Sequence, residues 1–247
     1  MNWHYFPRFI LLICVSSIYS NAQIQFHFGI EAGVPLTDTL SSTSSSSSIP
    51  NSFSFDQYNS ETKRLLIGPT FRVALVHGLG IEFDALYQRV DYDHANGTSQ
   101  PAAQFFVQSF EQTTGNRWQF PLLVQYSKSL SKAKVYVEVG PSISRIADSH
   151  TTFRSTTSTG STTSSQTSTV TGQGGTLAGI TTGAGIDLPL FHLHLRPEFR
   201  YSHWFSPNVP SVGFISAAYF AAPGVSAMFP IFRTNQNEAA FLLGLTF

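Results

Sequence analysis

The sequence predicts an all-β protein whose strands form an eight-stranded antiparallel barrel across a membrane. Three observations support this prediction: eight segments alternate between apolar and polar residues, long connections alternate with short ones, and charged residues are scarce. Successive side chains leave a strand on opposite faces, so a period of two indicates a strand whose two faces differ. Membrane barrels have short turns on one side and long loops on the other.

Composition and length narrow the class of protein further. The 247 residues fit one domain of barrel size. Charged residues make up 11% of the chain, against about 25% in soluble proteins. No apolar run reaches the roughly 20 residues that a membrane helix needs. The formal net charge is zero, so the chain lacks the basic character of a nucleic-acid-binding protein and we expect no nucleic-acid partner.

The first 22 residues have the features of a secretory signal peptide. Arg8 supplies the positive charge, residues 9–18 are largely apolar, and small residues precede the expected cleavage site. Cys14 is the only cysteine and would leave with this peptide. We therefore expect residues 1–22 to be removed, and residues 23–247 to form a barrel without disulfides or thiolate metal sites.

The first four predicted strands each have one apolar and one polar face. In residues 23–34 the even positions are apolar, and in residues 65–76 the odd positions are. Residues 79–87 place apolar side chains at odd positions, opposite glycine and two carboxylates. Residues 117–126 place Trp, Phe, Leu, Val and Tyr at even positions. Each segment has about the ten residues that a tilted strand needs to cross the hydrocarbon.

The remaining four predicted strands follow the same rule. Valines occupy odd positions of residues 135–143, and glycines and a carboxylate occupy odd positions of residues 178–188. Residues 193–201 place Leu, Phe and Tyr opposite a face with histidine, arginine and glutamate. Residues 238–247 alternate Phe241, Leu243, Leu245 and Phe247 with smaller or weakly polar residues.

Long polar connections are expected near residues 36–63, 93–115, 146–175 and 205–237. They are rich in Ser and Thr. Residues 151–175 contain too little apolar matter to form a core and are expected to be a mobile loop. Within the last connection, residues 213–232 are unusually apolar. They could form an extra hairpin, which would give ten strands, or a cap over the barrel mouth.

The polar faces of the predicted strands collect six acids and five bases, one of which is Lys134. An eight-stranded barrel is just wide enough for side chains, and buried charges must be paired because an unpaired one is costly. We therefore expect a plugged, ion-paired lumen and an apolar surface turned to lipid. The expected lumen network consists of Glu31, Arg72, Glu82, Asp84, Arg117, Glu138, Asp187, Arg196, Glu198 and Arg200. The alternative is a soluble, lipocalin-like barrel with these faces inverted.

Aromatic residues and prolines add two expectations. Five aromatic residues near strand ends are typical of the girdles at membrane interfaces: Tyr87, Trp118, Tyr126, Tyr201 and Trp204. Some of them could equally belong to a core. Four prolines inside predicted strands each remove a donor from the sheet, so we expect bulges, irregular pairing or positions near the rim of the barrel. These prolines are Pro69, Pro121, Pro141 and Pro197.

Several motifs together resemble the small outer-membrane β-barrel proteins of Gram-negative bacteria, the OmpA/OmpX-like superfamily. The motifs are residues 31–36, 78–87, 120–123, 140–142, 196–201 and 244–247. The resemblance covers the whole mature chain and implies export to the cell outer membrane. It also implies that the barrel-assembly machinery recognises Phe247 on the last strand.

Function is less well defined by the sequence. We expect a monomer with a structural or surface-interaction role, in contact with outer-membrane lipids and an unidentified extracellular partner, without cofactor, metal or catalytic residues. The alternatives are a narrow porin-like channel and an outer-membrane lipid-modifying enzyme. His192 and His194 have no further metal ligand nearby in sequence. Ser202 and His203 are adjacent, so they point to opposite faces of a strand and cannot readily act together.

Overall fold

A computed structural model describes residues 24–172, 175–206, 208–209, 232–233 and 235–247. The expected signal peptide and the apolar residues 213–231 lie outside the described residues. Among those described, no helix combines the length and the apolar character needed to cross a bilayer. The two helices that are described are single 3-10 turns at Val76–Gly78 and Pro101–Ala103.

The described residues are otherwise almost entirely strands. Their bounds are β1 (Gln25–Pro35), β2 (Thr43–Ile49), β3 (Ser52–Ala74), β4 (Leu79–Asp84), β5 (Leu86–Gln100), β6 (Phe105–Leu130), β7 (Ala133–Thr159), β8 (Thr162–Gly172), β9 (Thr176–Leu190), β10 (Leu193–Trp204), β11 (Asn208–Val209), β12 (Phe232–Arg233) and β13 (Asn237–Thr246).

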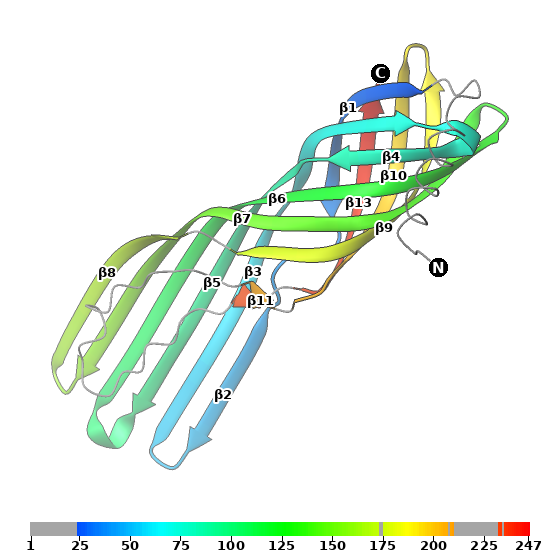
Figure 1. The fold of residues 1–247 in the computed structure, drawn as a ribbon. Helices are drawn as coiled ribbons and strands as arrows, with labels where there is room; N and C mark the ends of the chain where they lie inside the picture. Colours follow the sequence, from blue (N-terminus) through cyan, green and yellow to red (C-terminus); the bar gives the residue numbers. More distant parts are fainter. Residues whose placement is uncertain (1–23, 173–174, 207, 210–231, 234) are drawn as a thin grey trace, which may run out of the picture.

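Eight wall positions close into one antiparallel ring (Figure 1). The order is β1, β3, β4 with β5, β6, β7, β9, β10 and β13, and β13 pairs with β1 to close the ring. β4 and β5 count as one wall strand because only Ala85 separates them, and both pair with β3 and β6. The predicted antiparallel β-barrel is therefore confirmed, and in the described part of the chain its ring has eight wall strands.

The two faces of the ring have opposite character, as predicted. Large apolar side chains stand exposed on its outside, including Phe28 at 54%, Ile30 at 60% and Val137 at 56%. Glu82 and Arg196 are fully buried inside. A soluble barrel would place its charges outside, so this arrangement supports the prediction of a wall that faces lipid.

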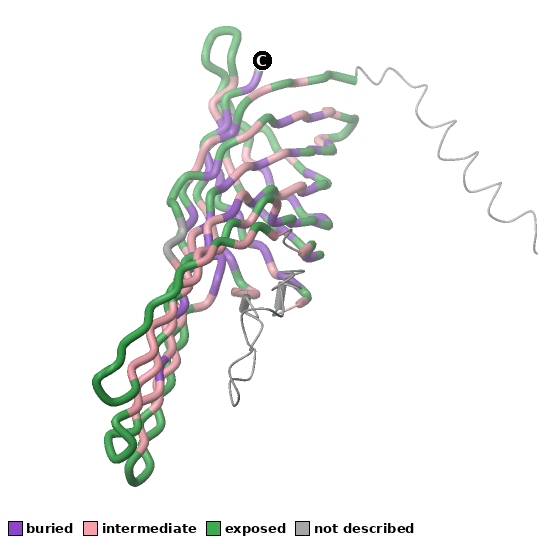
Figure 2. The backbone as a smooth tube through the Cα atoms, turned by 90° about the vertical axis from the view of Figure 1, so that its left-hand side faces the viewer, coloured by how far each residue is buried: buried purple, intermediate pink, exposed green. Residues whose placement is uncertain are grey.

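Three hairpins continue the wall far beyond the ring. β2 with β3, β5 with β6, and β7 with β8 join in the order β2-β3-β5-β6-β7-β8. We call this six-stranded region the extended sheet; it comprises residues 43–62, 90–115 and 149–172. Figures 1 and 2 show it as a narrow layer that runs on from one side of the ring.

The extended sheet corrects the prediction of irregular loops. The stretches expected near residues 36–63, 93–115 and 146–175 are connections, but most of their residues pair in regular ladders. The expected mobile loop at residues 151–175 is largely the hairpin of β7 and β8. Its Ser and Thr residues lack apolar alternation, which hid the strands, yet backbone hydrogen bonds to a neighbouring strand need no apolar face, and Thr favours strands.

The prolines in the ring interrupt pairing, as predicted. The ladder between β6 and β7 has a gap between Pro121↔Ser142 and Val124↔Val139, without a change of register. At this gap the two backbones approach closely, so that a Cβ added to Gly140 would overlap the carbonyl of Leu122. Gly68, beside Pro69, meets the carbonyl of Ala85 in the same way. Glycine is required where the backbones of two strands approach this closely.

Trp204 does not belong to an interfacial girdle. It is fully buried in a cluster with Leu40, Tyr92, Ile146 and Leu177, where the ring passes into the extended sheet. Trp204 lies on the same face of β10 as Arg200 and Ser202, which point into the lumen, because even positions of β10 face inward. The other four predicted aromatic residues are at least partly exposed on the outer face.

Candidate functional site

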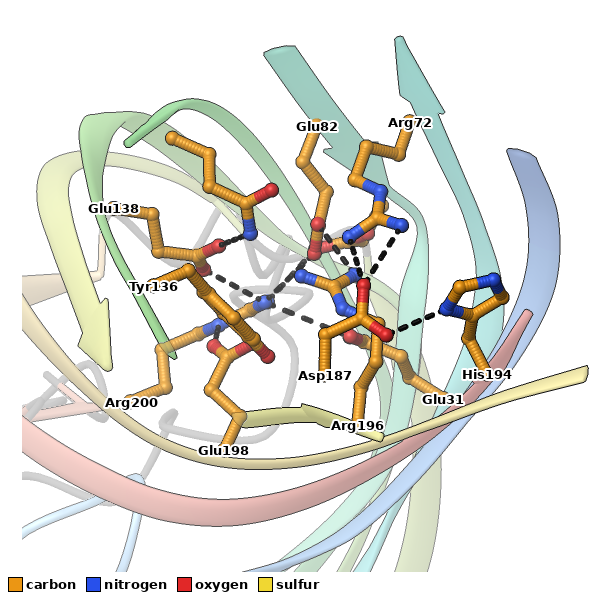
Figure 3. Close-up of polar contacts among 12 residues, drawn as sticks. Glu31, Arg72, Glu82, Tyr136, Glu138, Asp187, His194, Arg196, Glu198 and Arg200 are labelled. Carbon is orange, nitrogen blue, oxygen red and sulfur yellow. Dashed lines mark hydrogen bonds and ion pairs between the residues drawn. The ribbon is translucent and has the colours of Figure 1, made fainter. Parts of the chain in front are cut away.

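Arg200 is the centre of the lumen network (Figure 3). Its guanidinium lies within 3.6 Å of five carboxylates that come from β1, β4, β7 and β10. The nitrogen–oxygen distances are 2.6 Å to Glu198, 2.8 Å to Asp84, 3.1 Å to Glu138, 3.4 Å to Glu82 and 3.6 Å to Glu31. One side chain thus connects strands on opposite sides of the ring.

Arg196 supports the same cluster from one side. Its Nη1 donates to Glu82 Oε2 at 2.7 Å, and its guanidinium carbon lies 4.4 Å from the centre of the Tyr136 ring. The Tyr136 hydroxyl donates to Glu198 at 3.0 Å. A cation over an aromatic face, with the phenol turned to a carboxylate, is an arrangement that stabilises both groups. Tyr136 was not predicted as part of the network, although its even position on β7 places it inside.

A second group lies toward the short-turn end of the ring. Both terminal nitrogens of Arg72 donate to Asp187 Oδ2 at 3.2 Å. The other oxygen of Asp187 lies 2.6 Å from His194 Nδ1. The predicted residues Arg72 and Asp187 therefore belong to the lumen network, with His194 as an additional member.

Arg117 is separate from the Arg200 cluster. It lies toward the extended sheet, where it pairs with Glu238 at 3.0 Å and donates to Ser144 at 2.7 Å and Thr39 at 2.9 Å. Its guanidinium also lies 5.3 Å from the Trp204 ring. Glu238 was missing from the predicted network. Its alternation with Leu242 and Gly244 on β13 was the signal that could have placed it inside.

The predicted near-balance of charge in the lumen is wrong. Lys134 is exposed, because it lies just after the turn that begins β7. Among the described residues, four buried arginines therefore face seven buried carboxyl groups: Glu31, Glu82, Asp84, Glu138, Asp187, Glu198 and Glu238. Hydrogen bonds from neutral side chains add to the stabilisation of two of these carboxylates. Tyr136 donates to Glu198, and Gln125 donates to Glu138 at 3.4 Å.

Arginine already contacts the carboxylates that converge in the lumen. Two groups of carboxylates converge closely enough to hold a cation, but Arg200 contacts every member of both and takes the position that an ion would need. Ser202 bonds to Thr181 inside the ring at 2.8 Å, whereas His203 faces outward and lies 2.9 Å from Asn237. Ser202 and His203 therefore cannot form a nucleophile and base pair, as their adjacency predicted.

A different polar cluster lies on the extended sheet. The ring of His94 lies between two carboxylates, with Nε2 2.6 Å from Asp56 and Nδ1 3.4 Å from Glu111. Tyr58 stacks on the imidazole at 4.1 Å. Burial opposes protonation of His94, but the hydrogen bonds and charges of Glu111 and Asp56 outweigh it and raise the pKa of His94 above its ordinary value. His94 thus links β3, β5 and β6 by charge.

Three solved structures of other proteins match this chain at low sequence identity. Neisserial surface protein A (NspA) matches 92% of this chain and 97% of its own, with a TM-score of 0.34 and 11% identity. OprG from Pseudomonas aeruginosa matches 91% and 94%, with a TM-score of 0.47 and 11% identity. Ail of Yersinia pestis, in complex with the heparin analogue sucrose octasulfate, matches 90% and 99%, with a TM-score of 0.30 and 10% identity.

Comparison by sequence assigns the family. No curated protein matches the chain. The family model described as "outer membrane protein beta-barrel domain" matches residues 20–208, which is most of the chain and includes nearly all of the ring. The apolar outer wall, the charged lumen and this match agree, and the chain belongs to the outer membrane protein beta-barrel domain family, with its place in the outer membrane of a Gram-negative bacterium.

Proposed function

We propose that this protein is a non-conducting outer-membrane barrel that holds the extended sheet outside the cell as a binding surface. It acts as a structural and surface-interaction protein, not as an enzyme. The observation that carries the proposal is the position of Arg200, which binds carboxylates from four wall strands across the lumen.

Support for a blocked lumen comes from packing and charge. Glu82, Asp84 and Arg196 are fully buried, and Arg200 is 4% exposed. A cavity lined in part by Arg200 has a volume of about 20 Å³, which is room for about one water. An ion that crossed the ring would have to displace Arg200 from its carboxylates, and separating such buried pairs is costly.

Support for surface presentation comes from the asymmetry of the connections. The short turns between β3 and β4, β6 and β7, and β9 and β10 lie at one end of the ring. All three long hairpins leave the other end, which in barrels of this kind faces the outside. The exposed apolar wall contacts the membrane lipids, and we propose that Phe247 on the last strand is the residue the assembly machinery binds.

Planar-bilayer recording tests the blocked lumen. The purified protein is expected to give no steady single-channel steps, with a porin in the same membranes as the positive control. Regular steps of uniform size would favour the narrow channel and overturn the proposal.

Labelling of intact cells tests the surface presentation. Gln108 is exposed in the middle of the extended sheet, so Gln108→Cys should react with a membrane-impermeant maleimide on whole cells. Lys132, in the turn before β7, is exposed at the opposite end, and Lys132→Cys should react only after lysis. The reverse pattern would contradict the proposed orientation.

A further inference from the structure

The extended sheet has two free edges. Among the described residues, β2 pairs only with β3, and β8 pairs only with β7. Every other strand of this sheet has a neighbour on both sides. Alternate N–H and C=O groups of β2 and β8 therefore point away from the sheet, where another strand could pair with them.

Neither edge carries the usual protection against pairing. Proteins shield exposed edges with charged side chains, prolines or bulges. Thr43–Ile49 and Thr162–Gly172 contain no charged residue and no proline, and both pair in continuous register with their neighbours. The inner strands, in contrast, carry Asp56, Asp93 and Glu111. The uncharged strands are thus those at the edges, where a charge would block association.

Strand direction distinguishes the partners that fit. β2 runs away from the ring toward its turn at residues 50–51, and β8 runs back toward the ring from its turn at residues 160–161. Copies in one membrane share the same orientation. β2 of one copy and β8 of the next would therefore lie antiparallel, like every other pair in this sheet. Two β2 strands, or two β8 strands, would lie parallel.

We infer that neighbouring copies of this chain associate by pairing β2 of one copy with β8 of the next. This inference rests on the proposed exposure of the extended sheet outside the cell. The ring still closes within one chain, so the pairing adds a lateral contact to a barrel that is complete as a monomer. Because the two edges differ, the contact is head-to-tail and generates rows of copies or closed rings.

The side chains of the two edges suit each other. In the hairpin of β7 and β8, the hydroxyl of Ser158 lies 3.1 Å from that of Thr163, and that of Thr156 lies 3.3 Å from that of Ser165. Such Ser and Thr pairs contribute to antiparallel pairing. The consecutive serines of β2 can form the same pairs with β8 of a second copy.

Disulfide cross-linking in native membranes tests the pairing. Two differently tagged chains, both with Cys14→Ser, are expressed together, one with Ser46→Cys on β2 and one with Ser165→Cys on β8. One ladder row runs across the sheet from Ser46 to Ser165. The expected result is a mixed disulfide dimer in clear excess over dimers of either variant with itself.

Matched controls separate pairing from crowding. Gln108→Cys, exposed on the central strand β6, should give no dimer. Cross-linking that is equally strong for Gln108→Cys, or for two copies of Ser46→Cys, would overturn the inference. So would chains that remain monomeric, or a disulfide to a different protein.

Charge substitutions give an independent readout. The cross-link between Ser44→Cys and Thr167→Cys, two rows away on the same face, should be lost when Ser46→Lys and Ser165→Lys are present together. It should be retained when Ser46→Lys is combined with Ser165→Glu, because opposite charges across a strand pair attract. A loss with both combinations, or with neither, contradicts pairing of these edges.

The outcome for the surface proposal is separate. If Gln108→Cys is labelled on intact cells and no mixed dimer forms, the pairing of copies is rejected, and the proposal that the sheet lies outside the cell is retained. If Gln108→Cys is not labelled, the exposed sheet is rejected, whatever the cross-linking result.

Discussion

The lumen and the extended sheet share the strands β3, β5, β6 and β7 but are held together in different ways. In the lumen, buried charges join residues far apart in sequence, such as Arg200 and Asp84, which are 116 positions apart. In the extended sheet, exposed hydroxyls join neighbours within a hairpin, such as Ser158 and Thr163, five positions apart. The comparison teaches that buried ion pairs join opposite sides of the ring, whereas the extended sheet relies on backbone pairing and on contacts between neighbouring strands, such as the His94 cluster.

The largest expected effect is at the centre of the lumen. Arg200→Met leaves five carboxylates without their shared cation, and breaking such a buried pair typically costs about 3–5 kcal/mol. Unfolding in urea, followed by the gel shift of the heat-denatured barrel, measures the loss. Arg154→Met, which removes an exposed arginine of the extended sheet, is the control. If Arg200→Met and Arg154→Met were equally stable, the charge in the lumen would contribute no more to stability than a charge on the extended sheet.

The next effect lies in the wall of the ring. Gly140→Ala places a Cβ against the carbonyl of Leu122, and overpacking of this kind typically costs about 1–3 kcal/mol. Gly244→Ala is the matched control, because its Cβ meets its nearest neighbours at 3.4 Å, an ordinary contact. The same urea unfolding compares them. If Gly140→Ala were as stable as Gly244→Ala, the close approach at the proline gap would not constrain the ring.

A pH effect is expected in the extended sheet. The pKa of His94 is raised, so its charged contacts with Asp56 and Glu111 stabilise the sheet fully below the ordinary histidine pKa of about 6.5. That stabilisation is lost as the pH rises through the higher folded pKa. Hydrogen exchange of β3, β5 and β6, corrected for the intrinsic rate, should show protection that decreases over this range.

The control for the pH effect is His94→Gln, which should flatten the dependence while leaving the sheet paired. A pH dependence that persists in His94→Gln would assign the effect to another group.

The smallest effect concerns the surface hydroxyls. Ser158→Ala with Thr163→Ala removes one exposed hydroxyl pair and should change the free energy of unfolding by less than about 0.5 kcal/mol. Urea unfolding is again the measurement. A change as large as that of Gly140→Ala would mean that side chains, and not the backbone, hold the extended sheet.

The ring was predictable from the sequence because the membrane imposes a strict alternation. The odd or even position of a residue in its strand was enough to predict that Glu82, Arg196 and Arg200 lie inside and that Phe28 lies outside. The choice of ion-pair partners was not predictable, because it depends on which strands meet across the lumen. Trp204 shows where this rule was not applied far enough. Its even position places it inward with the charged residues, yet its place near a strand end suggested the membrane interface.

The extended sheet was missed for a physical reason. Both faces of Thr162–Gly172 meet water, so the strand shows no alternation of apolar and polar residues. Its pairing follows from the hairpin turn and the backbone, which carry little signal in composition. His94 was missed for the same reason, since its partners lie on strands that were expected to be loops.

The pairing of β1 with β13 makes closure of the ring a long-range event. Glu31 lies beside Gly244 in this ladder, so β1 finds this neighbour only in a segment far along the chain. Contacts between distant segments form slowly. Until β13 pairs with it, β1 presents an unpaired edge, and such an edge is a site at which other chains aggregate.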